Sequence, residues 1–282
     1  MMEAPVETPP EPMVSLRKLY WSDWGTETIQ RSDPDGSNIE TLITGVKPWG
    51  IALDVEGGKI YWVSLANQGV RRANLDGTNV EVIVQGTTGQ ELALDLQTGK
   101  VYWTAAGKIQ RANLDGSEVE DVITTSFTPD GIALDLVNGK VYWTEWEEIS
   151  PGAEELTDTI QRANLDGSNV EVLVRGLYIP QAITLDLDAG KMYWTNWPPV
   201  DNIQRANLDG TNVENIIPES ASVHDILFDF SADKFYWTDT GDWTNFGDGT
   251  IKRANFDGSE IEEVHTGLAV PTSVALDIGP IN

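Results

Sequence analysis

The sequence of 282 residues contains no cysteine, only two histidines, and 18 lysine and arginine residues against 45 acidic ones. The lack of cysteine excludes disulfides, thiolate metal sites and cysteine nucleophiles, and two histidines exclude a histidine-rich metal site. A formal net charge of −27 argues against nucleic acid, because phosphate backbones are bound through clustered lysine and arginine. No apolar run approaches the roughly 20 residues needed to span a bilayer. We therefore expect no nucleic-acid partner and no membrane insertion.

The sequence does contain an internal repeat and 11 tryptophans. A Tyr-Trp pair recurs six times, beginning at Tyr20, Tyr61, Tyr102, Tyr142, Tyr193 and Tyr236. One full unit reads "GIALDLVNGKVYWT" at 131–144 and "IQRANLDGSNVEVLVRG" at 160–176. Each unit has four short segments rich in β-branched and aromatic residues, which Gly, Asp and Asn turn signals separate. This pattern predicts four antiparallel strands, named a to d in chain order.

A repeat of about forty residues built from four strands is typical of a β-propeller blade, because one such sheet buries both faces only when neighbours pack around a ring. Six units predict an all-β, six-bladed propeller over residues 16–282, preceded by a Pro- and Glu-rich linker or tail at 1–15. The first Tyr-Trp pair has no strand a before it, whereas "SVALDI" at 273–278 has no strand b after it. We expect this C-terminal strand to pair with the N-terminal blade and close the ring.

These residues resemble the YWTD-type six-bladed propeller, the class B repeat of the low-density lipoprotein receptor family. The resemblance covers about residues 16–278, and the motifs "LDxxxGKxYWT" and "IxRANLDGS" recur together with the six-fold count. The tetrapeptide is complete only at 236–239, so its fourth position is loose here. The resemblance implies a non-catalytic module that binds proteins, in an extracellular or periplasmic location. A closed ring has little need of a second copy for stability, so we expect a monomer.

The loops divide the propeller into two unlike faces. The a–b and c–d turns have one length throughout, whereas the distance from the Tyr of the pair to the strand-c Arg runs from 9 to 20 residues. Variation is thus confined to the b–c and d–a loops, which share one end of the ring. Variable loops on a fixed scaffold are where recognition usually occurs. We therefore place the binding surface on this variable-loop face.

Aromatic residues outside the repeat map to the same face. Five tryptophans belong to the b–c loops or to the entrance of strand a: Trp24, Trp49, Trp146, Trp197 and Trp243. Phe127, Tyr178 and Phe246 join them. A single loop aromatic often only caps a blade, but several together are typical of a binding surface. We predict that these aromatics contact a protein or peptide partner, and a lectin-like role in which they stack on sugars remains an alternative.

Much of the acidity also lies outside the repeat. Recurrent positions account for 18 acidic and 12 basic residues, which leaves 27 acidic and 6 basic residues elsewhere. Acidic residues that follow the Tyr-Trp pairs into variable loops include Glu145, Glu147, Glu148, Asp239 and Asp242. They form either a solvated, salt-adapted surface or an electrostatic docking patch. The second interpretation predicts a partner with basic and apolar side chains, bound through ion pairs and cation–π contacts.

The axial channel offers a third hypothesis. Equivalent positions at the start of strand a place polar residues at its mouth: Gln90, Glu91, Asp130, Gln181, His224 and Asp225. Metal-dependent propeller hydrolases and lactonases bind a metal with carboxylates and amides in such a channel, so a similar role is a weaker alternative. We predict no catalytic residue, no metal and no cofactor, and we interpret "SDPDGSN" at 32–38 as a turn. The recurrent strand-a Asp and strand-c Arg are expected to pair between blades, and His265 has no predicted role.

Overall fold

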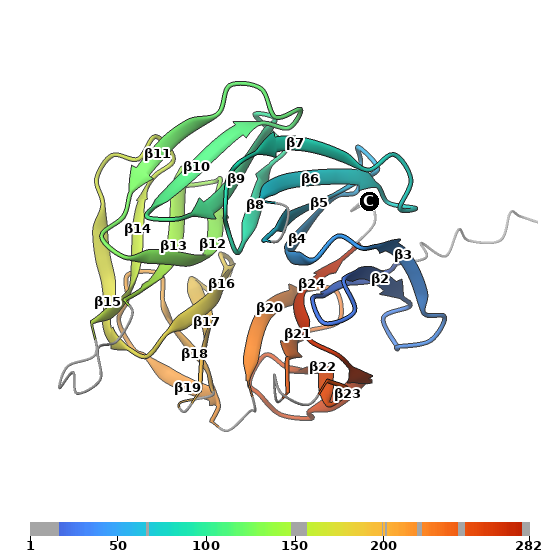
Figure 1. The fold of residues 1–282 in the computed structure, drawn as a ribbon. Helices are drawn as coiled ribbons and strands as arrows, with labels where there is room; N and C mark the ends of the chain where they lie inside the picture. The colour runs from blue at the N-terminus through green and yellow to red at the C-terminus, as the bar shows by residue number, and fades with distance from the viewer. Residues whose placement is uncertain are drawn as a thin grey trace, which may run out of the picture.

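The computed structural model describes residues 17–65, 68–147, 157–198, 200, 202–218, 222–241 and 246–277. Within these residues the chain forms 24 strands in six antiparallel sheets of four, and no helix. The sheets stand as blades around a central axis (Figure 1). The predicted all-β, six-bladed propeller is therefore confirmed.

Each blade has one inner strand, a, and runs outward through strands b, c and d. Blade 1 contains β24 (Pro271–Leu276), β1 (Leu19–Asp23), β2 (Thr28–Ser32) and β3 (Glu40–Thr44). Blade 2 contains β4 (Pro48–Asp54), β5 (Lys59–Ser64), β6 (Gly69–Asn74) and β7 (Glu81–Gln85). Blade 3 contains β8 (Leu92–Asp95), β9 (Lys100–Ala105), β10 (Lys108–Asn113) and β11 (Glu120–Thr124).

The second half of the ring repeats this order. Blade 4 contains β12 (Thr128–Asp135), β13 (Lys140–Trp146), β14 (Asp158–Asn164) and β15 (Glu171–Leu177). Blade 5 contains β16 (Pro180–Asp186), β17 (Lys191–Asn196), β18 (Asn202–Asn207) and β19 (Glu214–Ile217). Blade 6 contains β20 (Val223–Asp229), β21 (Lys234–Asp239), β22 (Gly249–Asn255) and β23 (Glu262–Leu268).

Ring closure occurs in blade 1, as the sequence predicts. The C-terminal β24 pairs antiparallel with β1, and Val274 lies opposite Trp21. At the junction with blade 6, His265 Nε2 lies 2.9 Å from the Ser32 hydroxyl, and its ring centroid lies 4.6 Å from that of Trp21. His265 thus has a structural role that sequence reasoning missed, because its partner is 233 residues away.

The Tyr-Trp pairs form the core between blades. Adjacent residues of a strand point to opposite faces of the sheet, so the Tyr of each pair packs toward one neighbouring blade and the Trp toward the other. Tyr61 of blade 2, for example, shares a cluster with Trp103 of blade 3. All six repeat tryptophans are at most 1 % exposed. They are core residues, as the repeat indicates.

In blades 3, 4 and 5 the Thr that follows the Tyr-Trp pair ties neighbouring blades together, whereas blade 2 has Val63 at this position. Inner strands β4, β12, β16 and β20 carry a β-bulge at the variable-loop end, which frees backbone groups from the ladder. The Thr144 hydroxyl donates to the Gln181 carbonyl at 2.5 Å and accepts from Gly131 N at 2.8 Å. Thr104 and Thr195 donate equivalent bonds to the next blade. The YWT triplet is therefore a core pair followed by a link between blades.

The expected pairing of strand-a Asp with strand-c Arg between blades is wrong. Arg111 binds Glu120 of its own blade at 2.6 Å and donates to the Leu165 carbonyl of the next blade at 3.0 Å. The strand-a Asp135 accepts the Asn138 N–H of its own turn at 2.9 Å. A short Asp side chain satisfies nearby turn N–H groups more readily than it reaches a neighbouring blade. The blades are therefore linked by Arg-to-carbonyl bonds.

Candidate binding face and axial channel

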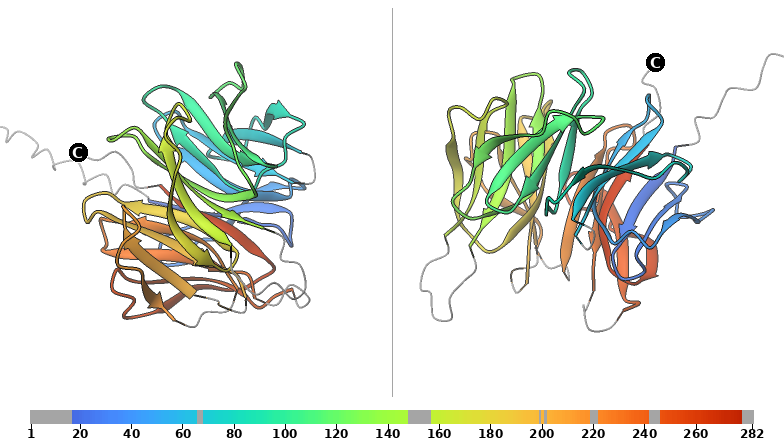
Figure 2. Two further views of the ribbon diagram at one scale, coloured as in Figure 1. Left: turned by 90° about the vertical axis from the view of Figure 1, so that its left-hand side faces the viewer. Right: turned by 45° about the horizontal axis from the view of Figure 1, so that its top comes forward.

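The two faces of the ring differ as the loop lengths predict. Inner strands run from the variable-loop face to the face of the uniform turns, and the left view of Figure 2 shows the ring from the side. Both described chain ends lie at the uniform face, where Asp277 N bonds to the Lys18 carbonyl and Arg17 forms an ion pair with Asp229 at 2.8 Å. The variable-loop face is consequently not covered by these ends.

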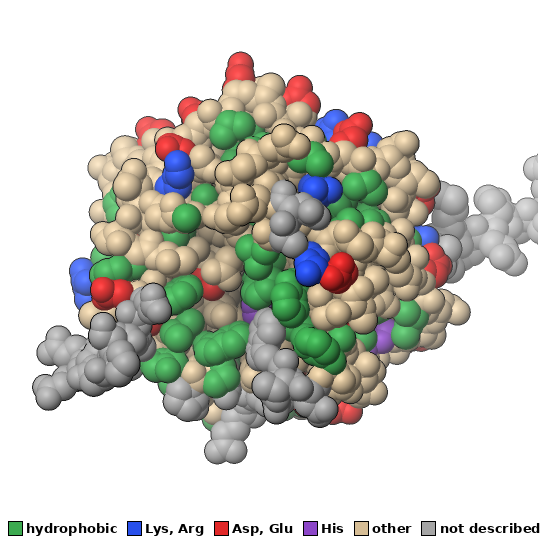
Figure 3. Space-filling model, in the orientation of Figure 1, with side chains coloured by type: hydrophobic (Ala, Val, Ile, Leu, Met, Phe, Trp, Pro, Cys, Tyr) green, Lys and Arg blue, Asp and Glu red, His purple; other side chains and the backbone are tan. Residues whose placement is uncertain are grey.

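Aromatic side chains gather on the variable-loop face around the channel mouth. The rings of Trp49 and Trp197 meet the His224 ring edge-on, with centroids 4.9 Å and 6.2 Å away. Hydrophobic side chains cluster at the centre of this face, whereas acidic ones lie mostly toward the rim (Figure 3). Four further aromatics of the prediction are partly buried: Trp24, Phe127, Trp146 and Tyr178. Phe246, by contrast, is 59 % exposed. Trp243 lies outside the described residues.

Two of the predicted acidic contact residues are buried and hold the fold together by polar contacts within the chain. Glu145 is 1 % exposed, and its carboxylate accepts from Phe127 N, Trp143 Nε1 and Gln161 Nε2 at 2.6 to 3.1 Å. Asp239 is 3 % exposed and forms an ion pair with Lys252 at 2.9 Å. Both occupy the fourth position of the tetrapeptide.

This fourth position ties the end of strand b to the loops beside it, which explains its loose sequence. Asp23 accepts from Ala269 N and Val270 N, whereas Ser64 donates to the Val46 carbonyl. Each side chain therefore fits the particular loop that it meets. Glu147 is exposed, whereas Glu148 and Asp242 lie outside the described residues.

Alanine substitutions of Glu145 and Glu147 test whether the buried glutamate stabilises the fold and the exposed one does not. Glu145→Ala is expected to destabilise the fold by about 2–4 kcal/mol, because three donors, among them the buried Trp143 Nε1, lose their acceptor. Glu147→Ala is expected to change stability by no more than about 0.5 kcal/mol, as is usual for an exposed side chain. Urea unfolding followed by tryptophan fluorescence measures both values. Equal effects of the two changes would contradict the structural role of Glu145.

Equivalent positions on the six inner strands build rings of residues down the channel. The mouth ring consists of Trp49, Gln90, Asp130, Gln181, His224 and Thr272. The next ring consists of Gly50, Glu91, Gly131, Ala182, Asp225 and Ser273. The third ring is apolar, and each member lies opposite a core Trp in the ladder: Ile51, Leu92, Ile132, Ile183, Ile226 and Val274.

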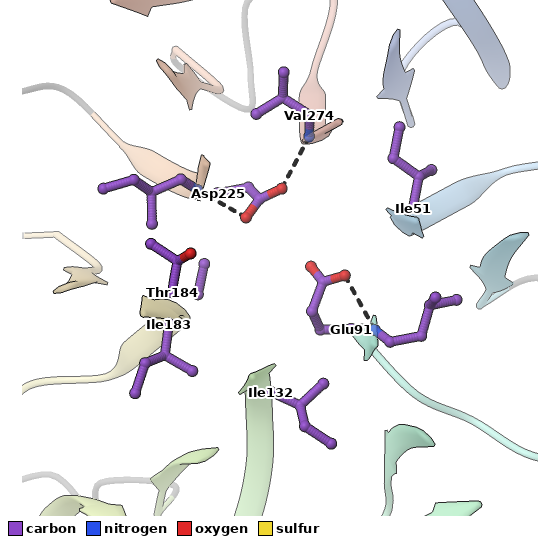
Figure 4. A pocket seen from close by; sticks show the side chains of 10 residues that line it. Ile51, Glu91, Ile132, Ile183, Thr184, Asp225 and Val274 are labelled. Carbon is purple, nitrogen blue, oxygen red and sulfur yellow. Dashed lines mark hydrogen bonds between the residues drawn. The ribbon is translucent and has the colours of Figure 1, made fainter. Parts of the chain in front are cut away.

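Glu91 and Asp225 share a cavity in this channel. The cavity has a volume of about 130 Å³, and the two carboxylates project into it from opposite sides (Figure 4). They lie three blades apart in the ring, because the inner strands follow each other in the order β24, β4, β8, β12, β16, β20. Gly50 leaves room for Glu91, since a Cβ there would collide with the Glu91 carboxylate. The sequence placed both acids near the mouth but did not show that they face each other.

The channel acids are held in an environment that favours their neutral forms. Burial raises the pKa of Asp130 to about 7, although the Trp146 indole beside the carboxyl opposes the rise. Burial likewise raises the pKa of Asp225 to about 6, against hydrogen bonds from Ser273 and from two backbone N–H groups. The pKa of Glu91 lies well above its usual range through burial and the nearby charge of Asp225. Burial lowers the pKa of His224 to about 4.

The channel does not assemble a metal cluster among the described residues. Within them, no group of three or more His, Asp or Glu side chains could hold a metal ion. Asp225 accepts hydrogen bonds from Ser273 Oγ at 2.7 Å and from Val274 N at 2.9 Å.

The segment 32–38 forms a turn like those of the sibling repeats. Asp35 accepts a hydrogen bond from Ser37, as its counterparts do, and Asp33 forms an ion pair with Lys18 at 2.6 Å. The described part of the chain also has no helix long and apolar enough to cross a membrane.

Comparisons with known proteins agree with this architecture. A model of the low-density lipoprotein receptor repeat class B matches residues 17–55. A chain in the crystal structure of a nidogen/laminin complex superposes with a TM-score of 0.75 at 18 % identity, over 92 % of this chain and 98 % of that one. TolB from Acinetobacter baumannii superposes with a TM-score of 0.72 at 16 % identity, over 93 % of this chain and 66 % of that one. No curated protein sequence matches the chain.

The fold and these matches define the class of protein. The chain is a six-bladed β-propeller, and its residues 17–55 match the class B repeat of the low-density lipoprotein receptor. The two structural neighbours share the fold at low sequence identity.

Proposed function

We propose that this chain is a recognition module without catalytic activity, which binds a protein or peptide partner on its variable-loop face. The observation that carries the proposal is the aromatic cluster of Trp49, Trp197 and His224 over the channel mouth. The repeat does not require this cluster, because sibling blades have Gln, Asp or Thr at the positions of Trp49 and His224. Aromatic side chains at the centre of a face are the usual anchors of a protein interface.

The character of the face supports a partner with apolar and basic side chains. Phe246 is 59 % exposed and Glu147 is exposed, and the molecule as a whole carries a net charge of −27. Indole rings attract cations, and an acidic molecule accelerates the approach of a basic partner. The similarity to a propeller crystallised in a nidogen/laminin complex supports a protein partner as well.

A peptide selection with a glycan array as its second arm tests the proposal. Peptides selected from a displayed library on the immobilised chain should share a motif, and they should bind Trp197→Ala about tenfold more weakly, as loss of an interface anchor predicts. Val80→Ala is the matched control, because Val80 is exposed at the uniform face, directly before strand d of blade 2. It should leave binding unchanged. Binding to glycans alone would favour the lectin-like alternative, and equal losses in both variants would contradict the proposed face.

The wider organisation follows from the same proposal. We place residues 16–282 in one propeller with a linker or tail at 1–15, and we propose that it acts as a monomer outside the cytoplasm. The class B repeat supports an extracellular or periplasmic location.

A further inference from the structure

We infer that the axial channel is a receptor for a single nitrogen-rich organic cation, the ammonium or guanidinium group of a Lys or Arg side chain, which enters from the variable-loop face and lies between Glu91 and Asp225. This inference rests on the proposed function and assigns the chemistry of the partner group that enters the channel. Three features of the channel lead to it: opposed carboxylates, acceptors without donors, and an aromatic entrance.

The two carboxylates are specific to these positions. The other four members of their ring are the small residues Gly50, Gly131, Ala182 and Ser273, so the fold does not need an acid there. Small neighbours leave the 130 Å³ cavity between Glu91 and Asp225. Among the described residues, no lysine or arginine is found among the groups that shift the pKa of either acid. Two buried carboxylates that face each other without a cation are costly, and a bound cation removes that cost.

Two buried acceptors above the cavity lack donors among the described residues. His224 is 3 % exposed, and its Nε2 has no hydrogen-bond partner among the described residues, while the ring bonds to the backbone of Thr272 through its other nitrogen. Its ring reaches Trp49, which belongs to a blade two steps away, so the imidazole lies over the axis. Gln181 Oε1 is likewise buried without a partner in the described part of the chain. Neutral imidazole nitrogen and amide oxygen both accept hydrogen bonds, so the channel needs a ligand with several N–H donors.

An organic cation fits this channel better than a metal ion does. The bulge carbonyls that could ligate a metal already accept bonds from the neighbouring blade, as Asp130 O does from Thr104 and His224 O from Thr195. The entrance is flanked by Trp49 and Trp197, whose indole faces attract ammonium and guanidinium groups. Below the carboxylates, the cavity is lined by the apolar third ring and by Thr184.

Calorimetric titration with three capped tripeptides tests the inference. The probes are acetyl-Gly-Arg-Gly-amide, acetyl-Gly-Lys-Gly-amide and the neutral acetyl-Gly-citrulline-Gly-amide, which has nearly the shape of the Arg peptide. At pH 8 the cationic peptides should bind at least about tenfold more tightly than the citrulline peptide, as a charge-assisted bond predicts. Glu91→Gln should weaken the cationic peptides by about tenfold or more, because it removes charge and keeps an oxygen for Leu92 N. Glu56→Gln changes an exposed acid in an a–b turn of the uniform face, so it should change binding less than about twofold.

The pH dependence adds a second readout. The titratable groups that face the ligand are Glu91, Asp130, Asp225 and His224. Binding should weaken from pH 8 to pH 5, because the acids take up protons in this interval.

Defined outcomes overturn the inference. They are equal binding of the citrulline and cationic peptides, unchanged peptide binding by Glu91→Gln, equal losses of binding in Glu56→Gln and Glu91→Gln, or protection against unfolding by added calcium chloride but by neither cationic peptide. If library peptides without Lys or Arg bind and depend on Trp197, the proposed function stands and this inference fails. If the cationic tripeptides bind through Glu91 while library selection finds no partner on the face, the inference stands and the proposed function fails.

Discussion

Removal of β24 is expected to unfold all six blades at once. A chain that ends at Ala269 leaves β1 without its inner partner and exposes the faces of blades 2 and 6 that pack against β24. It also removes Ser273, which bonds to Ile51 N and to Asp225. A domain is usually stable by only about 5–15 kcal/mol, and the loss of a buried central strand exceeds that margin. Circular dichroism and thermal melting should show no cooperative transition.

Two controls make this expectation specific. A chain that ends at Asp277 keeps β24 and should melt cooperatively. A synthetic peptide of residues 270–277 added to the shorter chain should restore the transition, because an extended peptide can replace a missing strand. Cooperative melting of the shorter chain without the peptide, at the temperature of the longer one, would show that blade 1 does not close the ring.

Stability is expected to fall as the pH rises from 5 to 8. The folded-state pKa values of Asp130, Asp225 and Glu91 are raised, so these acids stabilise the fold most below their unfolded pKa, and this contribution is lost as the pH rises through the folded values. A shift from 3.8 to about 6 in Asp225 corresponds to about 3 kcal/mol. His224 and His265 act in the opposite direction, because their pKa is lowered and stability is lost as the pH falls below about 6.5.

The variant Glu91→Gln separates the effect of the buried channel acids on stability from the effect of the exposed acidic residues. At pH 8 the variant should be more stable than the parent by about 1–3 kcal/mol, since an amide carries no buried charge, and at pH 5 the difference should shrink. Glu147→Gln should lie within about 0.5 kcal/mol of the parent at both pH values. Chemical unfolding across this range measures the curves. Two results would contradict raised pKa values for the buried channel acids. One is a free energy of unfolding of the parent that rises from pH 5 to pH 8, and the other is a Glu91→Gln variant with the same pH dependence as the parent.

Much of the scaffold could be predicted because its causes are local and repeated. The alternation of side chains along a strand buries both Tyr and Trp of a pair between blades, and Gly after Asp allows the tight c–d turn. The turn at Gly116 shows this directly, with a φ of +83° and a backbone approach to Ile83 O that leaves no room for a Cβ. Ring closure through β24 could be predicted from the missing and surplus strands at the two ends.

The candidate site could be predicted only in outline. Counting from the repeat placed Trp49, His224, Glu91 and Asp225 at the variable end of the inner strands. Counting did not separate Glu145, which is buried under hydrogen bonds, from Glu147, which is exposed two residues later. That difference depends on which loop of the neighbouring blade each side chain meets, and those loops are the least regular part of the repeat.

The sequence by itself determined the number of blades, the strands of each blade, the strand that closes the ring and the face on which the loops vary. These follow from hydrophobic alternation, turn residues and spacing, which act within about forty residues. Only the tertiary structure decided that Glu91 and Asp225 oppose each other across a cavity and that His224 lies between Trp49 and Trp197. The physical reason is that residues up to 175 positions apart meet at the axis only after six blades close, and no local pattern encodes which of them share it.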